Sequence, residues 1–365
     1  MKTKLTLFLL LLASSLQLMF SQTWEYSNAL ENEWMRKICT QGLDTVYIVG
    51  RNGLIARSTD RSETWTKQYP VTDQLNDIIF CNNTTGFAVG NNGTILKTVD
   101  GGDTWIQVTS GTSENLNAIA AASIGNIWTV GDNGMVLYSH DCGSVWQVKD
   151  LSLTAQLNDI SFRNSTGYII GSNSVCYKTT DTGDSWNNLD LISGDNLIVQ
   201  QTENGHLYIL YNYDFETTNI YSDGNISSTE YVLTSFYMVN DSIGYGGLLP
   251  RIPTGVGGGH VLMTLYKFGK YIGDIYLPIN SLFFDQYSSD ILIINDSIGY
   301  AVTGGYLYRI NNNLTGLNEQ QINADLLIKQ ERDCLKIMTR SLKKDLEVEI
   351  ISLYGFIIYK QKGDE

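Results

Sequence analysis

The stretch FAVGNNGTILKTVDGGDTW, residues 87–105, decides the fold because three other segments of this 365-residue chain align with it without gaps. These segments are YIVGRNGLIARSTDRSETW at 47–65, WTVGDNGMVLYSHDCGSVW at 128–146 and YIIGSNSVCYKTTDTGDSW at 168–186. Their closing tryptophans, Trp65, Trp105, Trp146 and Trp186, are separated by 40, 41 and 40 residues. A fixed period of this length indicates a repeat architecture in which stacked units bury a continuous core.

Each unit predicts four short strands. In the second unit they fall at 75–80, 86–89, 94–98 and 105–108. An Asn-Gly pair separates the second and third strands in three units, at 52–53, 92–93 and 133–134. Because Asn-Gly tolerates the positive φ angles of a type I′ turn, it is a strong hairpin signal. Four strands in about 40 residues match one blade of a β-propeller.

The link between the third and fourth strands carries a second motif, Ser/Thr-x-Asp-x-Gly-x-Thr/Ser-Trp. The Asp carboxylate is suited to accept backbone N–H groups of its own turn, Gly supplies a left-handed conformation, and Trp buries a large apolar area. We therefore interpret the motif as structural, with a catalytic acid or a calcium ligand as the alternative for each Asp. The motif residues are Ser58, Asp60, Thr64, Trp65, Thr98, Asp100, Gly102, Thr104, Trp105, Ser139, Asp141, Gly143, Trp146, Thr179, Asp181, Gly183, Ser185 and Trp186. Two copies are altered, with Ser62 in place of Gly and Val145 in place of Thr.

This motif resembles the Asp-box, or BNR repeat, of sialidases, sortilin-type receptors, some glucanases and photosystem II assembly factors. The four copies cover about 165 residues. The chain as a whole resembles the photosystem II stability/assembly factor-like family of WD40/YVTN-like propellers. The resemblance implies a scaffold that binds other proteins, with the boxes on the rim and away from any active site.

The repeats predict an all-β, seven-bladed propeller of four-stranded blades over residues 22–316. The expected blades are 34–69, 75–109, 116–150, 157–190, 197–232, 235–276 and 290–311. The last blade borrows residues 23–28, because Trp24 lies 41 residues before Trp65 and its surroundings look like a box-terminal strand. Closure by Trp24 would leave no free sheet edge. Six or eight blades are the alternatives.

Both ends of the chain indicate export. Residues 1–21 form a predicted signal peptide, with Lys2 and Lys4 before an apolar run and Ser21 at the cleavage site. Residues 317–365 form a predicted β tail, whose alternating strands around Tyr354 partly resemble the sorting domain of type IX secretion cargo. The typical Tyr-Pro-Asn-Pro phrase is missing, and a small packed β appendage without an export role is the alternative. We therefore expect an extracellular or cell-surface protein that passes through the periplasm.

The composition excludes some functions. Acidic residues outnumber basic ones 38 to 24, which gives a formal net charge of −14. Nucleic-acid binders usually present a basic face, so we predict no nucleic-acid partner. The 43% hydrophobic content supports a real core, and no stretch after the signal peptide is apolar enough to span a bilayer.

No catalytic, metal or cofactor site is predicted. The five cysteines have no metal-site spacing, and His140, His206 and His260 lie far apart in the sequence. Asp77 and Asp159 are candidate paired carboxylates, but both occupy the same place in a repeated Leu-Asn-Asp phrase, which favours a structural role. The sialidase-like phrase at Arg251 follows the boxes, whereas sialidases carry it before them, so sialidase activity is not expected. The glycine-rich segment 251–260 is interpreted as a hairpin within a blade, with an anion-binding loop as the alternative.

The sequence therefore predicts a non-catalytic, monomeric scaffold for a protein or glycan partner. The alternative is a carbohydrate-active propeller, either a glycoside hydrolase or a lectin-like module. Facing carboxylates with clustered aromatics in the central channel would favour that alternative, and a channel without convergent titratable groups would favour the scaffold.

Overall fold

The computed structural model describes the residues in the following ranges: 23–191, 194–212, 218–229, 233–240, 243–248, 261–267, 270–277, 289–295, 298–303, 305–311, 320–323, 326–331, 334–339, 347–351 and 357–362. Contacts divide the chain into two units. One is Trp24–Ile310, and the other combines Met1–Thr23 with Asn311–Glu365.

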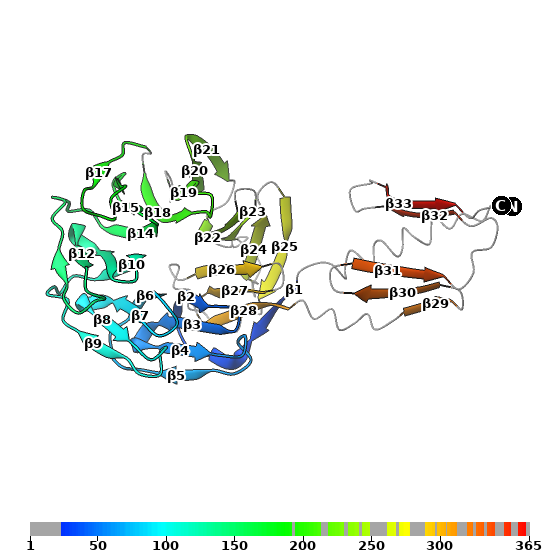
Figure 1. The fold of residues 1–365 in the computed structure, drawn as a ribbon, viewed down its shortest axis with the longest axis horizontal. Helices are drawn as coiled ribbons and strands as arrows, with labels where there is room; N and C mark the ends of the chain where they lie inside the picture. The colour runs from blue at the N-terminus through cyan, green and yellow to red at the C-terminus, as the bar shows by residue number, and fades with distance from the viewer. Residues whose placement is uncertain are drawn as a thin grey trace, which may run out of the picture. The chain divides into compact units, whose positions relative to one another are not determined.

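The first unit is a β-propeller (Figure 1). Its described strands form six four-stranded sheets, which we call blades 1 to 6. Blade 1 consists of β2 (Met35–Gln41), β3 (Thr45–Gly50), β4 (Ile55–Ser58) and β5 (Thr66–Gln68). Blade 2 consists of β6 (Leu75–Phe80), β7 (Gly86–Gly90), β8 (Ile95–Thr98) and β9 (Ile106–Val108). Blade 3 consists of β10 (Leu116–Ser123), β11 (Asn126–Gly131), β12 (Val136–Ser139) and β13 (Gln147–Val148).

Blades 4 to 6 complete the set. Blade 4 consists of β14 (Leu157–Arg163), β15 (Thr166–Gly171), β16 (Cys176–Thr179) and β17 (Asn187–Asn188). Blade 5 consists of β18 (Asp195–Gln201), β19 (Leu207–Asn212), β20 (Thr218–Ser222) and β21 (Asn225–Thr229). Blade 6 consists of β26 (Ser289–Asn295), β27 (Ile298–Thr303) and β28 (Tyr306–Asn311) together with β1 (Thr23–Ser27).

The all-β propeller is confirmed, but the prediction of seven four-stranded blades is wrong. The segment expected to form a blade at 235–276 instead forms two separate two-stranded sheets. One pairs β22 (Leu233–Asn240) with β23 (Ile243–Leu248), and the other pairs β24 (Val261–Lys267) with β25 (Lys270–Leu277). This segment lacks the Asn-Gly turn and the Asp-box that tie the third and fourth strands to the second in the early blades. Blades 5 and 6 also lack the Asp-box, but there at most five residues join the second strand to the third, whereas twelve residues, 249–260, separate β23 from β24.

Blade 6 joins the two ends of the propeller. Its strand order is β1-β28-β27-β26, so the N-terminal strand is the outer strand of a sheet whose other strands come from residues 289–311. The side chain of Trp24 lies outside the described part of the structure, as do the predicted signal peptide and the segment 251–260.

The Asn-Gly turns are built as the sequence predicts. In the turn after β7, Asn92 has φ 54° and ψ 35°, Gly93 has φ 68°, and the N–H of Thr94 donates to the carbonyl of Asn91 at 3.0 Å. A Cβ atom on Gly93 would lie 2.1 Å from the carbonyl oxygen of Thr112. The turn therefore needs glycine both for its backbone angle and for the close approach of the next connection.

The hydrophobic core lies between neighbouring blades. One cluster combines Phe87, Val89 and Ile95 of blade 2 with Leu116 and Ile119 of blade 3. A second joins blade 1 to blade 6. Because each blade buries its faces against its neighbours, no blade is expected to be stable alone.

The second unit contains two small antiparallel sheets. One is three-stranded and consists of β29 (Gln320–Asn323), β30 (Leu326–Glu331) and β31 (Cys334–Thr339). The other pairs β32 (Glu347–Ile351) with β33 (Ile357–Lys362). No helix among the described residues is long and apolar enough to cross a membrane.

Candidate functional site

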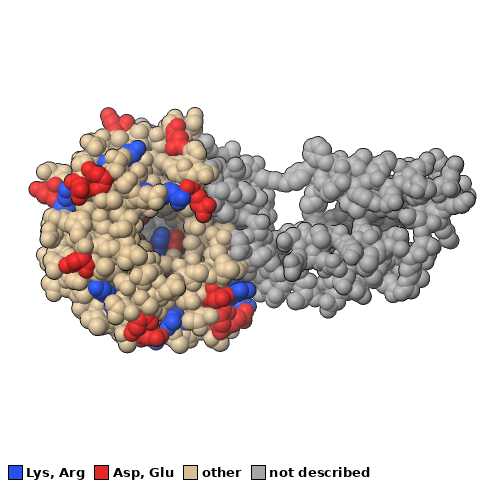
Figure 2. All heavy atoms as spheres, in the orientation of Figure 1, with Lys and Arg blue, Asp and Glu red and all other residues tan. Residues whose placement is uncertain are grey.

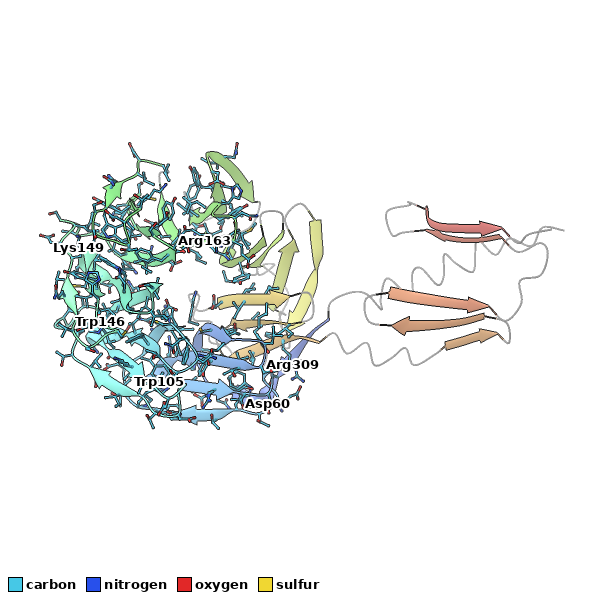
Figure 3. The ribbon with its side chains drawn as sticks, in the orientation of Figure 1. Asp60, Trp105, Trp146, Lys149, Arg163 and Arg309 are labelled. Carbon is cyan, nitrogen blue, oxygen red and sulfur yellow. The ribbon has the colours of Figure 1, made fainter. Side chains whose placement is uncertain are left out.

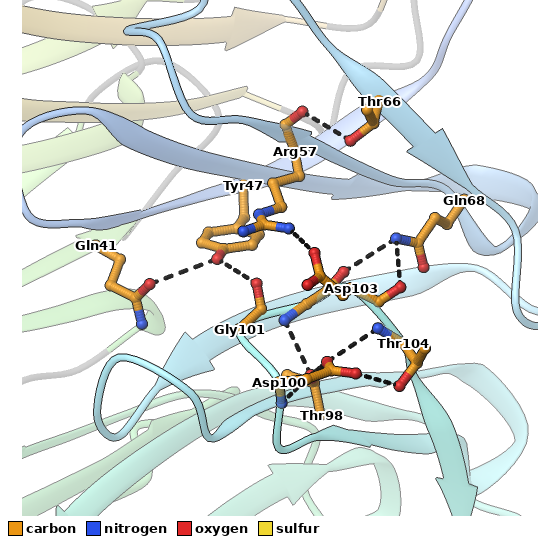
Figure 4. A network of polar contacts seen from close by, with 11 residues as sticks. Gln41, Tyr47, Arg57, Thr66, Gln68, Thr98, Asp100, Gly101, Asp103 and Thr104 are labelled. Atoms are coloured by element: carbon orange, nitrogen blue, oxygen red, sulfur yellow. Dashed lines mark hydrogen bonds and ion pairs between the residues drawn. The ribbon is translucent and has the colours of Figure 1, made fainter.

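The Asp-box turns hold their own carboxylates. In blade 2, the Thr98 hydroxyl donates to Asp100 Oδ1 at 2.7 Å, and the Gly102 N–H donates to Thr98 Oγ1 at 2.9 Å. The Thr104 N–H donates to Asp100 Oδ1 at 2.9 Å, and its hydroxyl donates to Oδ2 at 2.5 Å (Figure 4). Both oxygens of the carboxylate are thus engaged within one turn.

The boxes of Asp60 and Asp181 repeat this arrangement. In the box of Asp141, the Ser139 hydroxyl and the Val145 N–H both donate to Oδ1. Hydrogen bonds from the box threonines lower the pKa of Asp60 and Asp100 to about 2. The pKa values of Asp141 and Asp181 are also lowered. For Asp141 the largest cause is the hydrogen bond from the N–H of Val145, because valine has no hydroxyl to replace that of the box threonine. A carboxyl group with such a low pKa is ionised at neutral pH and cannot serve as a proton donor.

The box also packs against the preceding blade. A Cβ atom on Gly102 would lie 2.9 Å from Tyr47, one on Gly143 would lie 2.2 Å from Phe87, and one on Gly183 would lie 2.1 Å from Trp128. The three aromatic residues occupy equivalent positions in the second strands of blades 1, 2 and 3. The box glycine therefore makes room for an aromatic ring of the neighbouring blade.

Polar contacts reinforce this junction between blades 1 and 2 (Figure 4). The Tyr47 hydroxyl donates to the carbonyl of Gly101 at 2.8 Å. Arg57 forms an ion pair with Asp103, and the side-chain amide of Gln68 donates to the carbonyl of Gly102 at 3.0 Å. The box tryptophans add aromatic contacts to the preceding blade, for example Trp146 with Phe87 at 6.2 Å between ring centroids.

The box residues lie away from the central opening. Figure 3 places Asp60, Trp105 and Trp146 around the outer part of the ring. Figure 2 shows a basic and an acidic side chain inside the central opening itself, so the titratable groups at the centre are a different set.

Aspartates on the inner strands bridge neighbouring blades at the centre. Asp77 on β6 accepts the N–H of Ile78 at 2.8 Å with Oδ1 and the N–H of Ile119, on β10 of blade 3, at 2.9 Å with Oδ2. Asp159 on β14 likewise accepts the N–H of Ile160 and that of Val199 on β18 of blade 5, both at 2.8 Å. Each carboxylate therefore connects two adjacent sheets.

A third bridge lies where the chain closes on itself. Asp290 on β26 accepts the N–H of Ile38, on β2 of blade 1, at 2.9 Å and pairs with Lys37 Nζ at 3.3 Å. The Lys37 side chain keeps 36% of its surface exposed, and that of Asp290 keeps 11%. Closure of the ring thus combines an amide hydrogen bond with an ion pair.

The asparagine that follows the first leucine of the inner strand contributes a parallel set of bonds in blades 2 and 3. The side-chain amide of Asn76 donates to the carbonyl of Leu116 at 2.9 Å, and that of Asn117 donates to Leu157 at 2.9 Å. The whole phrase therefore attaches one inner strand to the next.

The central charges influence one another. Burial raises the pKa of Asp77 to about 7 and that of Asp159 to about 6, against the opposing effect of Lys37. Burial alone would lower the pKa of Lys37, but the carboxylates of Asp290, Asp77 and Asp159 together hold it above its usual value. Burial, followed by the charge of Asp77, raises the pKa of the Cys39 thiol to about 12, so this thiol is unreactive.

Sequence reasoning identified part of this centre. Asp77 and Asp159 both lie on inner strands, and their charges both act on Lys37. Lys37 and Asp290 were missed, although Lys37 occupies in blade 1 the register position of Asp77: Lys37 faces Val49 as Asp77 faces Val89. Asp290 precedes a buried isoleucine in the same way.

Other candidate groups do not converge. Among the described residues, no group of three or more His, Cys, Asp or Glu side chains could hold a metal ion. His206 pairs with Asp223, and His140 contacts Trp128 and Tyr138. Within the described ranges Cys39, Cys81, Cys142 and Cys176 are free thiols.

The centre therefore fits neither simple expectation for the channel. Titratable groups do converge, yet both oxygens of Asp77, Asp159 and Asp290 already accept hydrogen bonds from protein groups. Such carboxylates are suited to holding strands together, whereas a general acid or base must be able to reach a substrate proton.

Comparisons with known proteins agree with this architecture. The profile of the family described as Photosynthesis system II assembly factor YCF48 matches residues 57–147 and 103–210. Among solved structures, YCF48 bound to D1 peptide is similar, with a TM-score of 0.57 and 17% identity over 79% of this chain and 96% of that chain. YCF48 from Cyanidioschyzon merolae has a TM-score of 0.57 and 13% identity over 79% and 98% of the two chains.

An ancestral GH74 enzyme has a TM-score of 0.53 and 13% identity over 92% of this chain and 49% of that chain. No curated protein matches the sequence. At these identities the solved structures show the shared fold alone. The profile and the YCF48 structures support a β-propeller of the BNR-repeat, photosystem II assembly factor-like type.

Gly143→Ala tests the packing of a box turn on the preceding blade. Gly143 has φ 72°, and an added Cβ would lie 2.2 Å from Phe87, so we expect a loss of roughly 2–4 kcal/mol of unfolding free energy, measured by urea denaturation. Gly111→Ala is the matched control, because Gly111 has φ 80° but nothing within 4 Å of its added Cβ. Equal losses for the two variants would show that backbone strain, and not the contact with Phe87, sets the cost.

Asp77→Ala tests the central bridges through their pH dependence. The folded pKa of Asp77, about 7, lies above the ordinary value of 3.8, so between these pH values the folded state holds a proton that the unfolded state releases. This contribution to stability is present at low pH and is lost as the pH rises toward 7. The stability difference between wild type and Asp77→Ala should therefore shrink with rising pH, by at most about 1.4 kcal/mol per pH unit.

Asp100→Ala is the control of opposite sign. The pKa of Asp100 is lowered from 3.8 to about 2. Its contribution to stability is therefore present above about pH 4 and is lost as the pH falls from about 4 to about 2. Thermal unfolding of the three proteins from pH 2 to pH 8 measures both trends. A wild-type curve parallel to that of Asp77→Ala across pH 4–7 would contradict the inferred environment of Asp77.

Proposed function

We propose that this chain is an exported, non-catalytic β-propeller that binds a protein partner at the cell surface or outside the cell. The observation that carries the proposal is that the described carboxylates of both the boxes and the centre are engaged in holding backbone groups. The fold similarity to YCF48 bound to D1 peptide supports a peptide segment as the ligand class. We further propose that the protein is monomeric and uses no cofactor.

The alternative is a carbohydrate-active propeller. The convergence of Asp77, Asp159 and Asp290 on Lys37 and the fold shared with a GH74 enzyme favour it. The two functions make opposite demands on the central aspartates. A hydrolase needs one of them to reach a substrate, and a scaffold needs all of them to stay bonded to the neighbouring blade.

Binding selection with the protein of residues 22–365 separates the two functions. We expect selection from a displayed peptide library to enrich peptides that share a motif and bind with a dissociation constant in the micromolar range, roughly −8 kcal/mol, in fluorescence anisotropy. A panel of chromogenic glycosides and a glycan array should give no signal. Hydrolysis that disappears in Asp77→Ala or Asp159→Ala, with the fold retained by circular dichroism, would overturn the scaffold and establish the alternative.

The proposal that the protein is exported is based on the sequences of the two chain ends. Residues 1–21 are proposed as a cleaved signal peptide, and residues 317–365 as a sorting tail related to type IX secretion signals. This tail would act as an address and would have no part in ligand binding.

The two ends can be tested separately in the native cells. Leu9→Asp with Leu10→Asp, which interrupts the apolar run, should keep the protein in the cytoplasm with its first 21 residues still attached. Deletion of residues 317–365 should instead leave a processed protein in the periplasm. Fractionation and mass spectrometry of the N-terminus provide the measurement. Equal surface display of the wild type and the tail deletion would exclude a sorting role for the tail.

A further inference from the structure

The outer surface between blades 2 and 3 differs from the equivalent surfaces on either side of it. Phe87 pairs with Lys97, and Lys97 pairs with Ile106, so these three side chains share one face of blade 2. On this face Phe87 contacts Trp146 of blade 3, which lies in the outer part of the ring (Figure 3). Because side chains alternate along a strand, Val108 faces blade 3 as Ile106 does.

Val148 of blade 3 faces blade 2 from the other side of this junction. It pairs with Leu137, and Leu137 packs in one cluster with Phe87. Ile106 keeps 66% of its surface exposed, and Val148 keeps 58%. We call the strip formed by Ile106, Val108 and Val148 the apolar junction.

The equivalent positions in the neighbouring junctions are polar. The strand register identifies them, because each outer strand pairs with the third strand of its own blade in the same way. Between blades 1 and 2 they are Thr66, Gln68 and Gln107, and between blades 3 and 4 they are Gln147, Lys149 and Asn188. The rim is therefore apolar where blades 2 and 3 meet and polar on both sides of that place.

The ion pair of the preceding junction has no counterpart here. Arg57 of blade 1 pairs with Asp103 in the box of blade 2. The equivalent residues one blade further on are Lys97 and Ser144. The Ser144 hydroxyl donates to the carbonyl of Asp141 at 2.9 Å, so it is satisfied within its own turn. A serine at this position cannot neutralise the lysine as Asp103 neutralises the arginine.

Lys97 is available to an anion from outside the chain. Its Nζ lies 5.9 Å from the ring centroid of Phe87, and it forms no ion pair or hydrogen bond with any residue in the described ranges. In blade 3 the equivalent residue is Tyr138, whose hydroxyl donates to Gln147 at 2.7 Å. The polar groups of the neighbouring junctions are thus bonded within the protein, whereas the ammonium of Lys97 lies opposite exposed Ile106 without a partner in the described structure.

We propose that the apolar junction and Lys97 bind an extended segment of a partner protein in which carboxylate and apolar side chains alternate. The apolar side chains cover Ile106 and Val148 and so remove hydrocarbon surface from water, and the carboxylate pairs with Lys97 as Asp103 pairs with Arg57. An extended segment fits because β9 is the end strand of its sheet. The assignment to a protein partner rests on the proposed function.

Methyl NMR of the protein of residues 22–365, labelled at Ile and Val, observes the site directly. Titrations use N-acetyl-Leu-Glu-Leu-Glu-Leu amide and N-acetyl-Leu-Gln-Leu-Gln-Leu amide at 0.1 M salt, which screens the acidic excess of the chain over about 10 Å. We expect the glutamate peptide to shift the methyl signals of Ile106 and Val148, and the glutamine peptide to bind about threefold more weakly. Ile226, which is 57% exposed on the outer strand of blade 5, is the control methyl and should not shift.

Ser144→Asp is the decisive variant for the charge. Aspartate occupies this position in the boxes of blades 2 and 4, so the fold should be kept. The new carboxylate pairs with Lys97 and should abolish the preference for the glutamate peptide, as Lys97→Gln should also do. Lys178→Gln is the matched control, because Lys178 occupies the same position in blade 4, 5.5 Å from the ring centroid of Tyr168, but pairs with Asn187 on the outer strand. It should leave the titration unchanged.

Ile106→Thr combined with Val148→Gln tests the apolar part of the site. The new residues are those found at the equivalent positions, Thr66 and Gln107, and both replaced side chains are exposed, so the thermal midpoint should stay unchanged. This double variant should weaken binding of both peptides by at least about tenfold, because it removes the apolar surface that the leucines cover.

The outcomes separate this site from the proposed function. Library peptides that bind wild type and the double variant equally would overturn the site and leave the scaffold standing. An undiminished preference of Ser144→Asp for the glutamate peptide would overturn the role of Lys97. Methyl shifts of Ile106 and Val148 that grow with protein concentration, with a dimer in analytical ultracentrifugation, would make a second copy the occupant and overturn the partner segment. Glycoside hydrolysis with the peptide shifts retained would overturn the proposed function and support the site.

Discussion

The ring depends on the hydrogen bond that an inner-strand aspartate accepts from the backbone of the next blade. Asp77 reaches Ile119, Asp159 reaches Val199 and Asp290 reaches Ile38. Blades are separate sheets, so no strand ladder runs from one to the next, and apolar packing alone has no direction. These carboxylates provide directed bonds at the radius where the inner strands meet. The last of them, with Lys37, bridges blade 1 and blade 6, which contains both ends of the propeller.

Aspartates occur in opposite environments at the rim and at the centre of the ring. Box aspartates on the rim receive several donors in the open and have a lowered pKa. Central aspartates are buried and have a raised pKa despite their amide donors and Lys37. The net charge of −14 therefore combines turn acceptors, which are always ionised, with central groups that titrate near neutrality. The net charge is therefore a poor guide to partners.

Much of the architecture could be predicted because it is periodic. The tryptophan spacing gave the repeat, and the Asn-Gly turns gave the hairpins, as the φ angles of Asn92 and Gly93 confirm. The number of blades was wrong because residues 233–277 form two separate hairpins instead of one four-stranded sheet, with twelve residues between β23 and β24. The Leu-Asn-Asp phrase indicated a repeated role for Asp77 and Asp159, but its partner atoms lie about 40 residues away in the next blade. Lys37 replaces the repeated aspartate, and Asp290 lacks the Leu-Asn that precedes Asp77 and Asp159. Periodicity therefore could not identify these two residues, and only the strand register and the bridge to the next blade show their equivalence.

Residue-resolved hydrogen exchange of the backbone amides tests the central bridges most directly. The account predicts that the N–H groups of Ile38, Ile119 and Val199 exchange only with global unfolding of the propeller, whereas the N–H of Thr104 in the exposed box turn exchanges through local opening. Exchange of the three bridging amides at the rate of Thr104, under conditions where the strand amides remain protected, would contradict it.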